Sequence, residues 1–194
     1  VKECFQKEPP ISLIIQIQKR LYSPLKELQG TLRKMLRRVR KMQPVSQVET
    51  IDSGCIEWIA RQPGRTLSEK AGSKQEVLAV MREDSVDTYE NRVLKQCLIL
   101  GIAEASRYVR SFEKQYPASE RVKQVAQFKK QMLHMLRLDD FEKIGQLVDD
   151  SRPNYILQFD RKYKEVWWAY QELVRRKKAQ DELWKWRHRV WSEM

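Results

Sequence analysis

The chain has 194 residues, with 38 Lys and Arg against 26 Asp and Glu and a formal net charge of +12. A hydrophobic content of 41% is enough to build a core, which argues against a disordered chain, and the length fits one sizeable domain. Six glycines and seven prolines are few for this length and favour long helices over a β fold with many turns. The positive balance indicates a polyanionic partner such as DNA; the alternative is a soluble helical protein with basic faces.

Cysteine and histidine usage excludes several classes of site. Cys4, Cys55 and Cys97 are odd in number and far apart, so we expect neither a disulfide framework nor a zinc pair, and a cytoplasmic location fits. His134 and His188 have no ligand-spaced neighbours, so no metal and no cofactor are expected. No stretch approaches the roughly 18 apolar residues of a membrane helix, so no membrane partner is expected. Because the chain does not begin with Met, we expect a fragment of a longer protein.

The N-terminal part predicts a strand followed by a long helix. Residues 11–18 alternate apolar and polar, which is a strand period. We therefore expect residues 1–20 to be a remnant or edge strand of an upstream β region, and residues 21–194 to be a helical domain. Ser23 and Pro24 predict the start of a helix, and apolar residues spaced by three and four from 25 to 42 predict one seam along it.

The remaining elements complete a mainly α protein. A short strand is predicted over 76–83 and an extended segment over 155–159. A loop is predicted over 66–75. The expected fold class is a mainly α, long-helix bundle with a minor β element of one or two short strands. The predicted helices cover residues 52–60, 88–115, 118–137, 139–148 and 160 to the end.

Residues 86–98, VDTYENRVLKQCL, concentrate polar groups at the start of a predicted helix. Asp87 and Glu90 predict a capping box, in which Asp87 accepts the free N–H groups and Glu90 reaches back. Asn91 and Lys95 lie one turn apart on the same flank of the helix. We interpret all four as structural, with Asn91 and Lys95 tying the helix to a neighbouring element; a phosphate contact is the alternative.

The same stretch resembles a known family. DTYENRVLK is similar to the D-T-x-E-N-R-x-x-K signature of a helical domain of unknown function in McrC-like, restriction endonuclease-like bacterial proteins. IDSGCIEWIARQPGR, VLAVMRED and RPNYILQFDRKYKEVWWAYQEL resemble the flanking segments in order, over about residues 40 to 175. The resemblance implies the middle part of an antiviral defence protein, between a β-rich part and a PD-(D/E)XK nuclease. It also implies a separate AAA+ GTPase of McrB type as partner. No nuclease domain follows in this sequence, so catalysis is not transferred.

The primary expectation is a non-catalytic module that binds DNA through basic helix faces and bridges to the nuclease or GTPase. Trp186, in the tail WKWRHRVW, is a further candidate contact, because bases stack on aromatic rings. Trp184 and Trp191 continue the seven-residue series of Tyr163 and Tyr170 and are expected in a helical core. The candidate phosphate contacts are Arg33, Lys34, Arg37, Arg38, Arg40 and Lys41, followed by Arg175, Arg176, Lys177 and Lys178.

Two alternatives remain open. One is a Mg²⁺-dependent nuclease in which Asp149 or Asp150 joins Asp160 and Lys162 after an apolar strand. Asp160 is also a natural N-cap for the final helix. The other is a homo-oligomeric scaffold in which the 25–42 seam pairs between chains.

Overall fold

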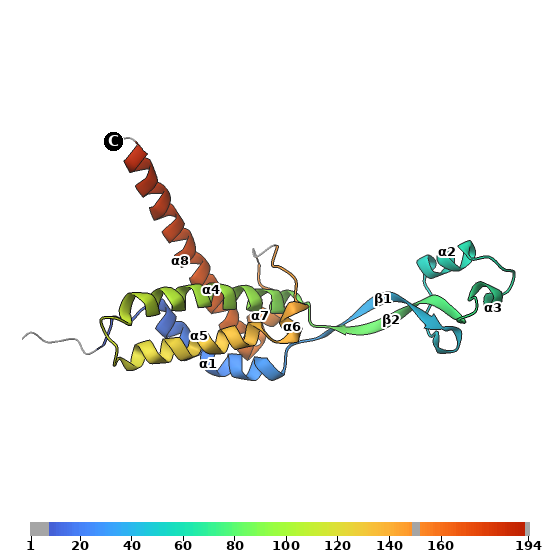
Figure 1. Ribbon diagram of the computed structural model, residues 1–194, viewed down its shortest axis with the longest axis horizontal. Coiled ribbons are helices and arrows are strands. Elements are labelled where there is room, and N and C mark those ends of the chain that lie inside the picture. Colours follow the sequence, from blue (N-terminus) through green and yellow to red (C-terminus); the bar gives the residue numbers. More distant parts are fainter. Residues whose placement is uncertain (1–7, 149–151, 193–194) are drawn as a thin grey trace, which may run out of the picture. The chain divides into compact units, whose positions relative to one another are not determined.

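The computed structural model describes residues 8–148 and 152–192, with side chains as far as Trp186. It confirms the predicted class, because helices dominate and the described part contains a single antiparallel sheet of two strands. The chain forms two compact units (Figure 1). Unit 1 comprises Val1–Arg33 and Val86–Met194, and unit 2 comprises Lys34–Ser85.

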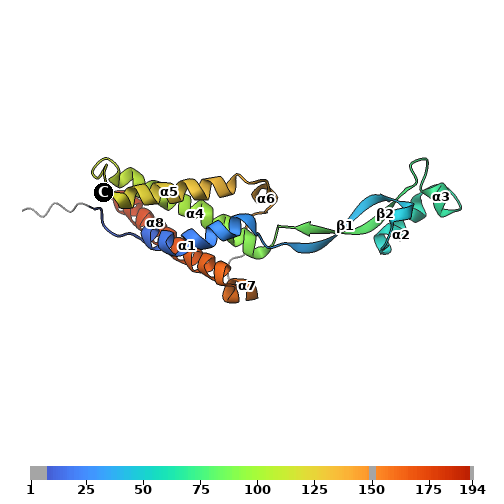
Figure 2. The ribbon, with the colours of Figure 1, turned by 90° about the horizontal axis from the view of Figure 1, so that it is seen from below.

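Unit 1 is a helical bundle around one apolar core. The long helix α4 packs against both α5 and α8, and α1 packs against α5 and α8 (Figures 1 and 2). The fully buried side chains include Leu94, Leu98 and Phe128. The predicted helices over 88–115 and 118–137 are therefore confirmed, whereas the helix expected over 139–148 is only one turn. The helices of this unit are α1 (Leu13–Gly30), α4 (Tyr89–Phe112), α5 (Glu120–Leu136), α6 (Asp139–Glu142), α7 (Tyr155–Phe159) and α8 (Arg161–Ser192).

The strand expected over 11–18 was wrong, and so was the boundary after residue 20, because Leu13–Gly30 is helix α1. The buried residues of α1 recur at the helical spacing of three and four, whereas Ile11, the first residue of the alternating series, is 62% exposed. Apolar residues are dense here, so both periods are present in the sequence. Burial against α5 and α8 selects the helical one. The buried residues are Ile14, Ile15, Ile17, Leu21, Leu25 and Leu28.

Unit 2 is built on a two-stranded antiparallel ribbon. Its strands β1 (Met35–Pro44) and β2 (Glu76–Ser85) pair in register from Met35 opposite Ser85 to Pro44 opposite Glu76. The strand predicted over 76–83 and the helix predicted over 52–60 are confirmed, and Asp52 caps the helix by accepting from the Cys55 N–H. The expected loop over 66–75 contains one helical turn. The remaining elements of this unit are η1 (Val45–Gln47), α2 (Ser53–Arg61) and α3 (Leu67–Lys70).

The long helix expected over 25–42 was wrong beyond Gly30. Helix α1 contains Pro24 in its interior and ends at Gly30. The chain then forms strand β1. Glycine at a helix end favours termination, and strand β2 offers β1 a full set of backbone partners. Leu25 and Leu28 are buried within unit 1. The 25–42 seam therefore does not exist, which removes the basis of the oligomeric scaffold that was expected to pair through it.

Candidate nucleic-acid interface

The polar signature at the start of α4 is organised by Thr88, not by Asp87 as expected. The Thr88 hydroxyl accepts from the Asn91 N–H, so Thr88 is the N-cap. Asp87 instead binds Arg92 through both carboxylate oxygens, at 2.6 Å each, and accepts from the Gly145 N–H at 2.9 Å. This carboxylate raises the pKa of Arg92. The N-cap is thus one residue later than predicted, and the Thr88 N–H donates to the Val86 carbonyl instead of to a Glu90 side chain. Asp87 ties α4 to the segment after α6.

Asn91 is completely buried and connects three parts of unit 1. Its side-chain nitrogen donates to the main-chain carbonyls of Arg33, at 2.8 Å, and Val86, at 2.7 Å. Its side-chain oxygen accepts from the hydroxyl of Tyr163 on α8. That hydroxyl also accepts from the Arg33 N–H at 3.2 Å, and burial raises the pKa of Tyr163 to about 12. The chain leaves unit 1 after Arg33 and returns at Val86. Asn91 therefore holds the points of exit and return beside each other.

Glu90 and Lys95 also have partners inside unit 1. Glu90, only 4% exposed, pairs with the Arg33 guanidinium at 3.2 Å and accepts from the Asn154 side chain at 2.9 Å. The Lys95 ammonium donates to the carbonyls of Phe141, at 2.8 Å, and Ile144, at 2.6 Å. All four signature residues therefore make contacts of the kind that hold a fold together. Arg33, expected to contact phosphate, belongs to this structural network.

The cations that follow Arg33 do not form one basic helix face, because they alternate along strand β1. Cross-strand neighbours share a face. Arg38 and Arg40 lie on one side of the ribbon, and Arg37 and Lys41 lie on the other side, with Glu83 opposite Arg37. The expected single cationic surface is therefore split. We call the side with Arg38 and Arg40 the arginine face; it comprises Leu36, Arg38, Arg40 and Met42 of β1 and Leu78, Val80, Arg82 and Asp84 of β2.

Two cations of the run are matched by carboxylates. Lys41 pairs with Glu83 at 2.5 Å, and Arg40 pairs with Asp52 at 2.7 Å. A side-chain carbon at Gly54 would lie 2.6 Å from Cζ of Arg40, so a larger residue there would make this guanidinium move. The hydrogen bond from Arg40 holds the pKa of Asp52 well below its usual range. Both pairs are half-exposed and locally neutral, so they offer little free charge to a phosphate.

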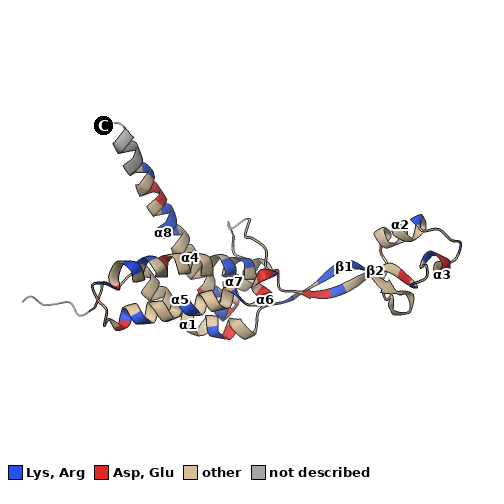
Figure 3. Ribbon diagram, viewed as in Figure 1, with Lys and Arg blue, Asp and Glu red and all other residues tan. Residues whose placement is uncertain are grey.

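Arg38 and Arg82 differ from these pairs. They lie directly opposite each other on the arginine face, and both are exposed. Neither makes a hydrogen bond or ion pair within the described part of the chain. Like charges directly opposite each other destabilise a strand pair, and a bound anion relieves the repulsion. Asp84 adds one carboxylate to the same face, opposite Leu36. Figure 3 shows the Lys and Arg positions along β1.

Arg82 was missed at the sequence level. The strand that carries it was predicted, but its register against β1, and hence its position opposite Arg38, depends on a pairing across more than forty residues of chain. Lys34, which precedes β1, is likewise exposed and makes no ion pair within the described residues. It remains a candidate phosphate contact beside the arginine face.

The second predicted cation group lies on α8 and is partly neutralised. Arg175 pairs with Glu172 at 2.8 Å, and Arg176 pairs with the buried Glu104 at 2.7 Å. Lys177 and Lys178 are exposed, without an ion pair to any described carboxylate.

Two tryptophans in the last described part of α8 are exposed. Trp184 and Trp186 are each 61% exposed. The expected place of Trp184 in a helical core was therefore wrong, because most of its side chain is open to solvent. Trp186 is accessible, as a contact residue requires. The side chain of Trp191 lies outside the described residues.

The nuclease alternative lacks its local structure. Tyr155–Phe159, expected as an extended segment leading to the motif, is helix α7. One Asp160 oxygen accepts from the N–H groups of Lys162, at 2.9 Å, and Tyr163, at 3.0 Å, so this carboxylate caps α8. The Lys162 ammonium donates to Thr31 at 3.4 Å. Asp149 and Asp150 lie outside the described residues. Residues 8–148 and 152–192 contain no group of three or more His, Cys, Asp or Glu arranged to hold a metal ion.

These features define a class of protein: a helical module into which a two-stranded ribbon is inserted between α1 and α4. A search against family models identifies it further. The chain belongs to the family described as Domain of unknown function (DUF2357), whose model matches residues 9–170. No curated protein and no solved structure matches the chain. None of its described helices combines the length and the apolar character needed to cross a membrane.

Proposed function

We propose that the chain is a non-catalytic module that binds DNA, with phosphates contacting the arginine face of unit 2. The observation that carries the proposal is the juxtaposition of Arg38 and Arg82, both exposed and without a partner among the described residues. Two facing guanidinium groups present planar arrays of donors, which match phosphate oxygens. Holding them opposite each other costs stability in the free protein, and an anion between them offsets that cost.

The wider role rests on resemblance. Because residues 87–95 are similar to the signature of McrC-like proteins, we propose that the module serves an anti-phage restriction system of that type. It would bridge the bound DNA to a nuclease or to an AAA+ GTPase. A non-catalytic role is supported by the signature itself, since Asp87, Glu90, Asn91 and Lys95 all have internal partners.

The test is the salt dependence of DNA affinity. Fluorescence anisotropy with labelled duplex and single-stranded DNA should give log Kd that rises linearly with log salt, with a slope near 0.9 per phosphate on duplex and about 0.7 on single strands. The R38A/R82A variant should bind more weakly, and its salt slope should correspond to about two fewer phosphate contacts.

A matched control separates this face from net charge. Arg110 and Arg137 lie in unit 1, are exposed and make no ion pair within the described residues. The R110A/R137A variant removes the same charge and should retain the wild-type slope. A flat salt response of the wild-type chain would refute DNA binding. Equal losses in both double variants would refute the assignment to the arginine face.

A further inference from the structure

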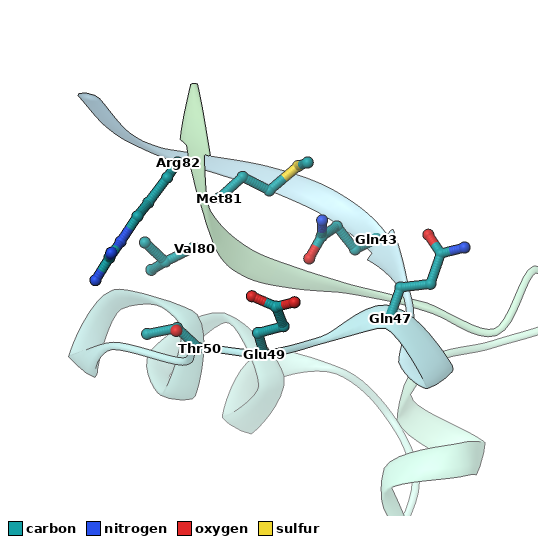
Figure 4. Close-up of a pocket in the computed structure, with 7 residues that line it drawn as sticks. All are labelled: Gln43, Gln47, Glu49, Thr50, Val80, Met81 and Arg82. Atoms are coloured by element: carbon teal, nitrogen blue, oxygen red, sulfur yellow. The ribbon is translucent and has the colours of Figure 1, made fainter. Parts of the chain in front are cut away.

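A polar groove lies beside the arginine face, entirely within unit 2 (Figure 4). It is formed where the chain after β1 turns back along β2, and the Val80 N–H fastens this return by donating to the Thr50 carbonyl at 2.9 Å. Its volume is about 480 Å³. The lining residues are Gln43, Gln47, Glu49, Thr50, Val80, Met81 and Arg82.

The polar side chains of this groove have no hydrogen-bond partner among the residues that the structure describes. The side chains of Gln43, Gln47, Glu49 and Thr50 make no hydrogen bond or ion pair within the described part of the chain. In Figure 4 the Glu49 side chain rises from the returning segment towards the strands, between Val80 and Gln43. Two amides supply donors and acceptors, Glu49 supplies acceptors alone, and two apolar residues of β2 complete the lining. Polar groups beside an apolar wall occur in sites for small ligands.

The groove is continuous with the arginine face through two residues. Arg82 lines the groove and lies directly opposite Arg38 on the arginine face. Val80 lines this groove and also the neighbouring hollow formed by Arg38, Arg40 and Asp52. A ligand that spans both places needs an anionic part at the arginines. Its other part must be uncharged and able to donate to Glu49, because this carboxylate repels a second anion. A nucleotide has this division between phosphate and base.

We propose that the groove binds an unpaired nucleobase that carries an exocyclic amino group, while the adjoining phosphate lies on the arginine face. The inference rests on the proposed DNA binding. A carboxylate accepts from the amino group of cytosine, and a glutamine amide pairs with adenine through one donor and one acceptor. Thymine offers a carbonyl oxygen at the position where cytosine has its amino group, so it leaves Glu49 unpaired. Base edges that are paired within a duplex cannot reach the groove, so the ligand is a single strand or an unpaired nucleotide.

The experiment compares two pyrimidine strands, which differ in this amino group and carry the same backbone. Affinities of the full chain for oligo-dC and oligo-dT of 12 nucleotides are measured by anisotropy at pH 8. We expect oligo-dC to bind at least about five times more tightly, the lower end of the discrimination from one well-placed base contact. The E49Q variant should abolish this preference without changing the salt slope. The E57Q variant removes an exposed carboxylate elsewhere in unit 2 and should leave the preference intact.

The outcomes separate the two proposals. The R38A/R82A variant should weaken binding of both strands by the same factor and leave their ratio unchanged. Equal wild-type affinities for the two strands, with a normal salt slope, would overturn base recognition and leave backbone binding in place. A preference that survives in E49Q would also overturn the assignment to the groove. Absence of binding to either single strand would overturn the base-binding groove, and absence of binding to duplex DNA as well would overturn the proposed function itself.

Discussion

The hydroxyl of Tyr163 donates to the side-chain oxygen of Asn91, and both side chains are buried in unit 1. The same hydroxyl accepts from the Arg33 N–H, and the nitrogen of the Asn91 amide donates to the Arg33 and Val86 carbonyls. One amide and one phenol thus satisfy the backbone at the two points where the chain leaves and re-enters the bundle. A buried backbone group without a partner costs free energy, so this network contributes to stability as well as to geometry.

Replacing Asn91 by Ala should destabilise unit 1 strongly. The substitution leaves the Arg33 and Val86 carbonyls and the Tyr163 hydroxyl without this partner, and each unsatisfied buried group costs about 1–3 kcal/mol. We expect a loss of about 3 kcal/mol in the free energy of unfolding, measured by urea denaturation followed by circular dichroism. Tyr163→Phe should cost less, and the double variant should lose less than the sum of the two. The exposed Gln127→Ala is the control; a similar loss there would contradict the assignment.

Stability should fall at alkaline pH. Burial raises the pKa of Cys97 from 9.0 to about 12 and that of Tyr163 from 10.0 to about 12. In the unfolded chain both groups release their protons at the lower values, so the folded state binds more protons between about pH 9 and 12. The free energy of unfolding therefore decreases as pH rises through this window. Urea midpoints at pH 8, 9, 10 and 11, under reducing conditions, measure the slope.

The Cys97→Ala variant tests the thiol separately. It removes one of the two titrating groups, so its slope against pH should be shallower than that of the wild type, whatever it costs at pH 8. An unchanged slope would show that Cys97 ionises equally easily in the folded and unfolded states.

Replacing Arg82 by Glu should improve the ribbon and impair its proposed function. An Arg–Glu pair directly across two strands replaces a repulsive pair, which is worth about 0.2–1 kcal/mol. Amides of β1 and β2 should exchange with deuterium more slowly, while DNA affinity falls. Lys74→Glu makes the same charge change at an exposed position outside the strands and should not slow that exchange. Faster exchange in Arg82→Glu would contradict a repulsive Arg38–Arg82 contact.

Local signals in the sequence were sufficient for some elements. The helix over 88–115 was predictable because its apolar residues recur at one helical period over many turns. The structural interpretation of Asn91 and Lys95 needed only their spacing on one flank. Their partners were not predictable, since Arg33, Phe141 and Ile144 lie more than forty residues away in sequence.

Residues 11–42 show where local patterns fail. Alternation over 11–18 and a three-and-four spacing over 25–42 are both present, but the structure has a helix over Leu13–Gly30 and a strand over Met35–Pro44. The outcome depends on long-range partners: α1 is buried by other helices of the bundle, and β1 is paired by β2. The candidate site was unpredictable for the same reason, because only the register of β1 against β2 places Arg38 opposite Arg82.

The Asn91 side chain holds the two ends of unit 2 beside each other through its bonds to the Arg33 and Val86 carbonyls. Both carbonyls that flank unit 2 lie within 2.8 Å of one nitrogen atom, so the ends of the 52-residue insertion are already adjacent. Joining adjacent ends with a shorter or longer segment costs little extra closure entropy. The bundle can therefore accept a segment of different length or sequence at this position without a change in its own packing.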